Sequence, residues 1–278
     1  MTGYKNGLRY ILKPLGNKHM SDIGIDDLQA YLDAIPHGRR TKEDCKTACG
    51  LLYTYGIPRN LTGGTLNFGK YLKLNYDKTQ DGIKRQSLTD EELRSLFALA
   101  DEGDEDAQVI CICCLMGWRP DELLSLLIEN VNLKERYIIG GAKTEAGINR
   151  PVPIHDRIFS YLDKIIRGRK EGYVFGNLHL GGTKRSLKRY REYHFYPCLE
   201  RAGIDNPLVP AGGGTERHRI TPHSCRHTFA RLLKGVKDSP VETKLDIIGH
   251  TDEDQLRDYM DSTLPERREV INKIHLDF

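Results

Sequence analysis

An arginine stands at a point where the sequence predicts that a helix begins. In segment 117–122, Arg119 is followed by Pro120, a residue type that favours the first turn of a helix. The free N–H groups of a helix start attract anions, and a guanidinium can bind two phosphate oxygens at once. Glu122, one turn on, can orient that guanidinium. Taken alone, these residues are explained more simply as a surface arginine paired with acids of its own helix.

A second predicted helix start, with Thr221 as the cap and Pro222 in the first turn, adds His223 and Arg226. Because they are three residues apart, these two side chains share one helix face. The pair supplies a second phosphate-binding cation and a group that titrates near neutral pH. His227, one turn after His223, raises the alternative of a metal site. No Cys, Asp or Glu stands at a matching ligand spacing, so the metal site is the weaker interpretation.

Three further residues complete an ordered series. Lys143 lies in a predicted hairpin turn, Gly249-His250 ends an apolar stretch, and Tyr259 follows nine residues after His250. In isolation, Tyr259 is one of fourteen tyrosines and is best explained as structural. The order Gly-x-Arg, Lys, His-x-x-Arg, Gly-His and Tyr nevertheless resembles the tyrosine recombinases of the phage integrase family. The resemblance covers about residues 87–262, and five weak motifs in the right order are together highly specific.

The resemblance implies how a DNA phosphate would be bound. Arg119 and Arg226 would bind the non-bridging oxygens of the scissile phosphate, His250 would add a hydrogen bond there, and Glu122 would support Arg119. A phosphodiester gains negative charge in the transition state, which two guanidiniums can stabilise.

The resemblance also implies how the strand is cut. Tyr259 would be the nucleophile, Lys143 would donate a proton to the leaving 5′ oxygen, and His223 would assist proton transfer. A phenol has a pKa near 10, so it needs cations and a proton acceptor to attack at neutral pH. The product would be a 3′-phosphotyrosyl link, which conserves the bond energy without ATP. The sequence has no Walker-type glycine loop and no acidic cluster typical of a Mg²⁺ nuclease, so we expect no cofactor and no metal.

The charge of the chain is unevenly distributed, although the net charge is only +3. Residues 143–235 carry 18 lysines and arginines against 8 acids, and residues 1–84 carry 13 against 8, whereas the other two segments are acidic. Basic segments that converge in the fold would form a phosphate-binding surface. A solvated surface with uneven charge explains the pattern equally well. The expected DNA-binding residues on a predicted helix at 183–202 are Lys184, Arg185, Lys188, Arg189 and Arg191.

Composition narrows the class of protein. No apolar run approaches the roughly 20 residues that span a bilayer, and the first ten residues lack the apolar core of a signal peptide. We therefore expect a cytoplasmic protein without a membrane partner. The seven cysteines are an odd number, which argues against a disulfide framework. Three of them lie in the apolar segment 109–118 and are interpreted as small buried hydrophobic residues.

The periodicity predicts a mainly α protein with a small β-sheet, an α+β fold. We expect a short or truncated helical domain that binds core DNA at residues 1–80, a linker at 81–86 and a catalytic domain at 87–278. Helices are predicted at 22–35, 41–55, 66–74, 107–116, 121–127, 156–167, 183–202 and 221–235, with a capping box at Thr89 and Glu92. A hairpin or meander is predicted at 130–154, a short strand at 173–175 and a Gly/Pro-rich loop at 207–219.

The family resemblance implies double-stranded DNA as partner, a tetramer on DNA and an accessory DNA-bending or excision factor. The favoured role is integration and excision of a phage or mobile element. A chromosome-dimer resolvase, a catalytically idle DNA-binding regulator and a type IB topoisomerase are the alternatives. The apolar stripe of the tail at 265–278 is expected to dock either on its own domain or, by exchange, on a neighbouring protomer.

Overall fold

The chain forms two compact units. The computed structural model describes residues 2–75, 83–141, 149–176, 182–212, 215–249 and 262–276. One unit comprises Met1–Lys84 together with Leu208–Arg217, and the other comprises Arg85–Pro207 together with His218–Phe278. The chain therefore passes from the first unit to the second within the segment predicted as a linker. It returns to the first unit at Leu208–Arg217 and then continues in the second unit.

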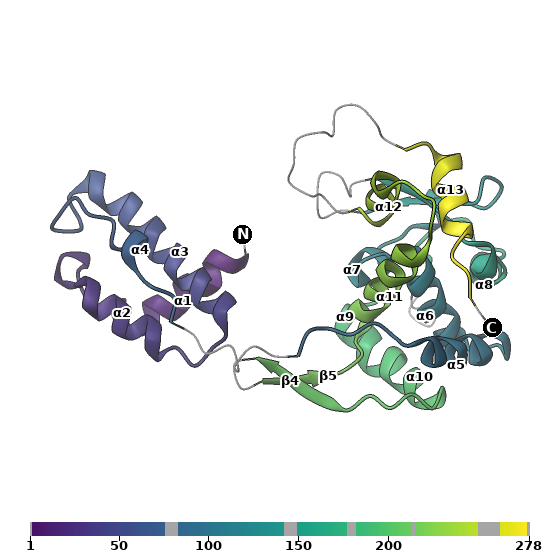
Figure 1. Ribbon diagram of the computed structural model, residues 1–278, viewed down its shortest axis with the longest axis horizontal. Coiled ribbons are helices and arrows are strands. Elements are labelled where there is room, and N and C mark those ends of the chain that lie inside the picture. Colours follow the sequence, from purple (N-terminus) through teal and green to yellow (C-terminus); the bar gives the residue numbers. More distant parts are fainter. Residues whose placement is uncertain are drawn as a thin grey trace. The chain divides into compact units, whose positions relative to one another are not determined.

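The first unit is a small helical bundle (Figure 1). Its longest helices, α1 and α3, pack closely because Gly7 has no side chain; a Cβ there would overlap the backbone carbonyl of Asp44. Its buried core includes Leu28, Leu32 and Cys45. The helices predicted at 22–35, 41–55 and 66–74 are all present, although the last is a single turn. The elements are α1 (Thr2–Leu15), α2 (Ile25–Ala34), α3 (Arg39–Gly56) and α4 (Phe68–Tyr71), with 3-10 turns at Met20–Asp22 and Ile57–Arg59.

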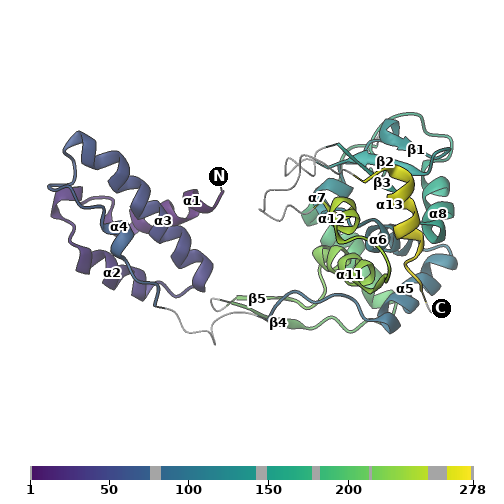
Figure 2. The same cartoon turned by 45° about the horizontal axis from the view of Figure 1, so that its top comes forward.

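The second unit is built around α6 (Glu105–Met116), which is buried on every side from Ala107 onward. A helix that is apolar all round belongs in the interior of a domain. Around it pack α5 (Asp90–Asp101), α8 (Asp156–Ile166) and α11 (Pro222–Gly235), as Figure 2 shows. The predicted capping box is confirmed, since Thr89 and Glu92 exchange backbone-to-side-chain hydrogen bonds at the start of α5. All seven cysteines are free and buried, including the three in segment 109–118 for which burial was predicted.

A three-stranded antiparallel sheet forms the predicted meander. Its strands are β1 (Val131–Asn132), β2 (Tyr137–Gly140) and β3 (Arg150–Pro153), in the order β1-β2-β3, and a 3-10 turn at Ile128–Asn130 precedes them. The register pairs Gly140 with Arg150 at the end of the β2–β3 hairpin. The connection between these two residues contains Lys143, which lies outside the described residues.

The predicted helix at 183–202 begins later than expected and is not uniform. Ser186 caps it, because its hydroxyl accepts a hydrogen bond from the Arg189 backbone at 3.3 Å. The helix then runs through α9 (Leu187–Tyr190), a π-helical turn (Arg191–Phe195) and α10 (Tyr196–Arg201). Pro197 lacks an N–H and so cannot continue the α-helical hydrogen-bond ladder, which is the physical reason for a change of helix type nearby.

Three other predictions are wrong. The stretch 207–219 is not a loop, because β4 (Leu208–Gly212) and β5 (Thr215–His218) form a two-stranded sheet there. The helix at 121–127 is only one turn, α7 (Pro120–Leu123), and the strand at 173–175 is a single bridge between Leu127 and Tyr173. The β4 strand also accepts a hydrogen bond from the linker end, from Ile83 N to Pro210 O at 2.9 Å.

The C-terminal helices pack on the second unit. They are α12 (Val241–Ile248) and α13 (Leu264–Asn272), and α13 lies beside β3 and α12 (Figure 2). Val270, Ile271 and Ile274 form the predicted apolar stripe and are buried in the core of the unit. In the single chain, the tail therefore docks in cis. No helix among the described residues is long and apolar enough to cross a membrane.

Candidate active site

Gly117 turns the chain from α6 toward Arg119. It has a φ of 65°, and a Cβ at this position would lie 2.9 Å from Cγ of the buried Phe229 and closer still to Cδ1. Only glycine meets both conditions without strain. The carbonyl of Gly117 accepts a hydrogen bond of 2.7 Å from Nη1 of Arg226. The turn thus connects the two arginines that the sequence singled out.

Arg119 is held by Glu122. Its Nη1 lies 2.9 Å from Oε1 of Glu122, and its backbone N–H donates to Oε2 at 3.1 Å. Burial raises the pKa of Glu122, but these two hydrogen bonds and the charge of Arg119 outweigh burial, so that the pKa is lowered overall. Glu122 is therefore an anion at neutral pH. It fixes one edge of a guanidinium that remains partly exposed, at 18% of its side chain.

Arg226 lies in the first turns of α11 and is 7% exposed. Besides Gly117, it donates to the carbonyl of Ile248 at the end of α12, with 2.6 Å from Nη2 to O. Burial and the nearby charge of Arg119 lower the pKa of Arg226 to about 10, although the negative charge of Glu122 acts in the opposite direction. Arg226 therefore stays charged at neutral pH. The fold brings together Arg119 and Arg226, which are far apart in the sequence.

His223 is half-buried on the same helix. The expected cap by Thr221 takes a different form: Thr221 N donates to Ser224 Oγ at 3.1 Å, while the Thr221 hydroxyl has no partner among the described residues. No group of three or more His, Cys, Asp or Glu able to hold a metal occurs in the part of the chain that the structure describes.

Lys143, His250 and Tyr259 lie outside the described residues, so the roles expected for them remain predictions. The structure does describe Gly249, which ends α12 with a φ of 65°. A Cβ on Gly249 would lie 2.5 Å from Nη1 of Arg150. Position 249 therefore requires glycine for two reasons: its backbone turns with a positive φ, and the guanidinium of the buried Arg150 approaches it closely.

Arg150 is the residue that sequence reasoning missed. It begins an Arg-Pro-Val-Pro-Ile segment, is 4% exposed, and its guanidinium carbon lies 4.4 Å from the centre of the Trp118 ring. A signal was present in the sequence: Arg150 and Val152 alternate on one face of a strand, and both are buried. Glu122 and Arg226 both act electrostatically on Arg150, so it belongs to the same cluster.

The expected DNA-binding residues divide by exposure. Lys184, Lys188 and Arg189 are exposed, whereas Arg185 and Arg191 are half-buried, and Arg191 lies 3.7 Å from Glu192. A pocket beside them is lined by Thr183, Lys184, Arg185, Ser186, Arg189, Tyr190, Tyr193 and His194. Basic side chains interleaved with aromatic ones are suited to nucleic acid.

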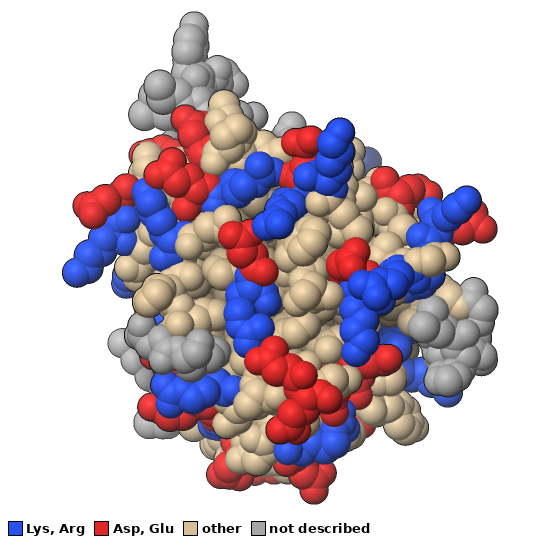
Figure 3. All heavy atoms as spheres, turned by 90° about the vertical axis from the view of Figure 1, so that its right-hand side faces the viewer, with Lys and Arg blue, Asp and Glu red and all other residues tan. Residues whose placement is uncertain are grey.

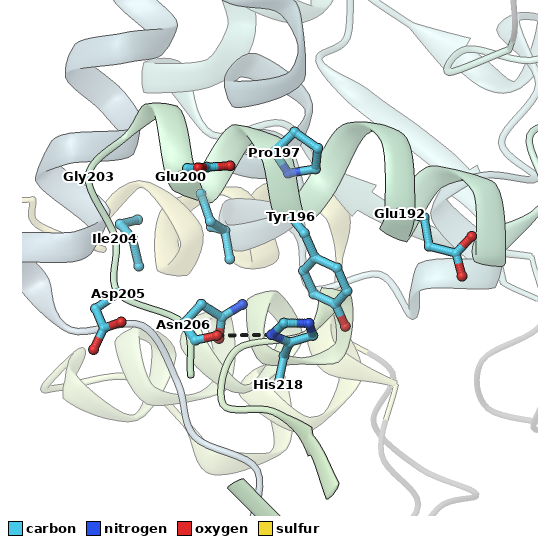
Figure 4. Close-up of a pocket in the computed structure, with 10 residues that line it drawn as sticks. Glu192, Tyr196, Pro197, Glu200, Gly203, Ile204, Asp205, Asn206 and His218 are labelled. Carbon is cyan, nitrogen blue, oxygen red and sulfur yellow. Dashed lines mark hydrogen bonds between the residues drawn. The ribbon is translucent and has the colours of Figure 1, made fainter. Parts of the chain in front are cut away.

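Two other parts of the described surface lack this character. Figure 3 shows a face on which basic and acidic side chains alternate, so positive charge is not gathered there. A second pocket, beside α10, is drawn in Figure 4, where the ring of Tyr196 lies against His218. Its lining includes Glu192, Glu200 and Asp205, whose charges would repel a phosphate.

Comparison with known proteins decides the family. Residues 86–265 match the model of the phage integrase family. This chain belongs to the phage integrase family. The integrase-family chain is 27% identical over 197 residues to the tyrosine recombinase XerA of Pyrococcus horikoshii, across 69% of this chain and 62% of that protein. It is 24% identical over 230 residues to a tyrosine recombinase of Pseudothermotoga lettingae, across 75% and 71%.

Solved structures share the fold of this integrase-family chain. The Tn1549 transposon integrase in complex with transposon right end DNA superposes with a TM-score of 0.68 at 18% identity, over 90% of this chain and 85% of that one. A lambda integrase tetramer bound to a Holliday junction gives 0.67 at 15% identity, over 92% and 73%. The expected mainly α fold with small antiparallel sheets is thereby confirmed.

Proposed function

We propose that this chain is a site-specific DNA recombinase that cleaves and rejoins strands through a 3′-phosphotyrosyl intermediate. The observation that carries the proposal is the convergence of Arg119 and Arg226, each oriented by its own hydrogen bonds. These arginines come from different helices and act electrostatically on one another. Like charges are brought together in a protein where an anion binds between them.

The arginines stabilise the charge that develops on the scissile phosphate. Because their orientation is fixed before DNA arrives, little reorganisation is needed in the transition state. Glu122 holds Arg119 at 2.9 Å, and the carbonyls of Gly117 and Ile248 hold Arg226. His223, two positions into α11, lies one helical turn before Arg226 and assists proton transfer.

Tyr259 attacks the phosphate and Lys143 protonates the leaving 5′ oxygen. A phenol near pKa 10 becomes a better nucleophile as its proton is accepted and the phosphate charge is neutralised. His250 adds a hydrogen bond to the phosphate. Attack by the 5′ hydroxyl of a partner strand then reverses the linkage, so neither ATP nor a metal takes part.

The substrate is duplex DNA, and the exposed residues Lys184, Lys188 and Arg189 contact its backbone. The lambda integrase structures with a dimer on a core site and a tetramer on a Holliday junction support a tetrameric assembly for this chain as well. In that assembly the tail at 265–278 exchanges between protomers, although it docks in cis in the single chain. An accessory DNA-bending or excision factor completes the proposed partners.

Covalent capture tests the proposal. The DNA site is obtained by sequencing the junctions of the element that encodes the chain, and a nicked duplex of that sequence traps the intermediate. The wild type should form a protein–DNA band on a denaturing gel in EDTA, and Tyr259→Phe should bind the same DNA without forming the band. Tyr71→Phe, at an exposed position of the first unit, is the matched control and should form it.

Three outcomes would contradict the proposal. A band that persists in Tyr259→Phe would remove Tyr259 as nucleophile. Activity lost in EDTA and restored by Mg²⁺ or Zn²⁺ would show that a metal takes part. Sequence-specific binding without any covalent band in the wild type would favour the idle regulator.

Resolution of chromosome dimers is the second candidate function. It is favoured by the sequence relatives, which are named tyrosine recombinases without reference to a phage or transposon. The chain spans about three fifths of the length of the Pyrococcus protein. Junction sequencing separates the two roles, because integration joins an element to foreign flanks whereas dimer resolution restores one chromosomal site.

A further inference from the structure

Arg150 is a buried cation without a described hydrogen-bond partner. It is 4% exposed, and none of its three guanidinium nitrogens has a partner among the residues that the structure describes. Its planar group stacks on Trp118, whose indole in turn lies against Gly140, where a Cβ would come within 3.2 Å of the ring. Burying a charged group with its donors unpaired is strongly unfavourable unless an acceptor completes it.

The surroundings of Arg150 carry an excess of positive charge. Arg226, Arg119 and, with the smallest effect, Arg267 lower its pKa electrostatically, and Glu122 is the acid that opposes them. Arg267 has its own acid, because its Nη2 lies 3.6 Å from Asp246. The remaining groups, Arg119, Arg150 and Arg226, are three guanidiniums against the one carboxylate of Glu122. Burial, followed by the charge of Arg226, lowers the pKa of Arg150 to about 10, so the group stays charged at neutral pH.

The three arginines differ in how many of their donors are already used. Arg226 donates to two backbone carbonyls, and Arg119 donates to Glu122. Arg150 donates to no described acceptor, so its N–H groups are the ones whose hydrogen-bonding capacity is unused. Trp118 beneath the guanidinium contributes a cation–π contact but accepts no conventional hydrogen bond.

We propose that Arg150 is a third arginine of the phosphate site, and that its unpaired N–H groups bind the phosphate held by Arg119 and Arg226. The proposal rests on the function proposed above in taking this anion to be the scissile phosphate of DNA. The two uncompensated positive charges match a phosphodiester whose negative charge increases in the transition state. Arg150 is positioned for this at the start of β3, where it pairs with Gly140 of β2.

Anion binding is tested first without DNA. Thermal unfolding is followed by the fluorescence of Trp118, the single tryptophan, in orthophosphate and in chloride at equal ionic strength. The wild type should unfold at a higher temperature in phosphate. Arg150→Met should unfold in chloride at the wild-type temperature or above, because an apolar side chain replaces a buried unpaired charge, and the phosphate-induced rise should disappear.

The matched control is Arg267→Met. Arg267 is also buried, at 7% exposed, and has the smallest of the electrostatic effects on Arg150. Unlike Arg150, it has partners, because Nε donates to Ser262 Oγ at 3.0 Å and Nη2 lies 3.6 Å from Asp246. This variant should unfold at a lower temperature in chloride while keeping the rise in phosphate. If Arg150→Met instead lowers the unfolding temperature and keeps the phosphate response, Arg150 is structural and the proposal is wrong.

A second test uses the cleavage reaction. On the DNA site that the wild type cleaves, Arg150→Met should slow covalent capture by about 100-fold. On the same duplex with a methylphosphonate at the scissile position, one negative charge is absent, so the defect should shrink to about tenfold or less. An equal defect on both substrates would refute phosphate binding by Arg150. If the wild type cleaves neither duplex, the proposed function fails, while the orthophosphate measurement still decides the role of Arg150.

Discussion

Replacing Gly117 by alanine should destabilise the second unit through two effects, backbone strain and a clash with Phe229. The left-handed backbone, with a φ of 65°, costs an alanine about 1–2 kcal/mol. The new Cβ would also lie 2.9 Å from Cγ of Phe229 and closer to Cδ1, and overpacking of a core typically costs about 1–3 kcal/mol. Together, Gly117→Ala should lower the free energy of unfolding by about 2–5 kcal/mol.

Urea unfolding followed by tryptophan fluorescence measures this destabilisation. The only tryptophan, Trp118, is fully buried in the second unit, so its signal reports on that unit alone. Gly203→Ala is the matched control, because Gly203 has a φ of 69° but nothing within 4 Å of an added Cβ. It should show the backbone cost by itself, about 1–2 kcal/mol. If both variants are destabilised by the same free energy, the predicted clash with Phe229 is wrong.

Further predictions concern the chemistry and its environment. Lys143→Ala should slow cleavage strongly but recover on a substrate whose leaving 5′ oxygen is replaced by sulfur, which needs no proton donor; equal slowing on both would mean that Lys143 only binds DNA. Replacing Lys188 and Arg189 by glutamine should flatten the slope of log K against log salt by about 0.9 for each DNA phosphate that is no longer neutralised, whereas an unchanged slope would remove this segment from the interface. The lowered pKa of Glu122 contributes stability above its unfolded value near 4.5, and this stability disappears as pH falls through the folded value. The gap in urea midpoint between the wild type and Glu122→Gln should therefore narrow in acid, and a constant gap would contradict this reasoning.

Features with a local cause could be predicted from the sequence. The capping box at Thr89 and Glu92 depends on residues three positions apart, and the buried character of 107–116 follows from its composition alone. The family motifs were recognisable because their order is kept along the chain. The β2–β3 hairpin was likewise marked by turn residues between two β-rich stretches.

Features that depend on tertiary contacts were mispredicted. The stretch 207–219 is rich in glycine and proline, yet it forms a hairpin that is paired with the linker end at Ile83, a partner more than 120 residues away. The basic helix was predicted to start at 183, whereas the cap at Ser186 decides where it begins.

The alternation of Arg150 with Val152 could suggest burial from the sequence, but it could not place Arg150 in the site, because its unpaired donors are visible only in the tertiary structure. An arginine in a strand that contains two prolines is ordinarily exposed at a sheet edge. Only the packing of Trp118 beneath it and Gly249 against it shows that the guanidinium is buried. The need for glycine at positions 117 and 249 is likewise visible only in the tertiary structure, because each lies against a side chain distant in sequence.

Mapping the covalent bond tests the central claim most directly. The captured protein–DNA complex is digested with nuclease and protease, and the peptide that retains a nucleotide is sequenced by mass spectrometry. We predict that the nucleotide is attached through its 3′ phosphate to the oxygen of Tyr259. A nucleotide attached to another residue, or attached through a 5′ phosphate, would contradict the account.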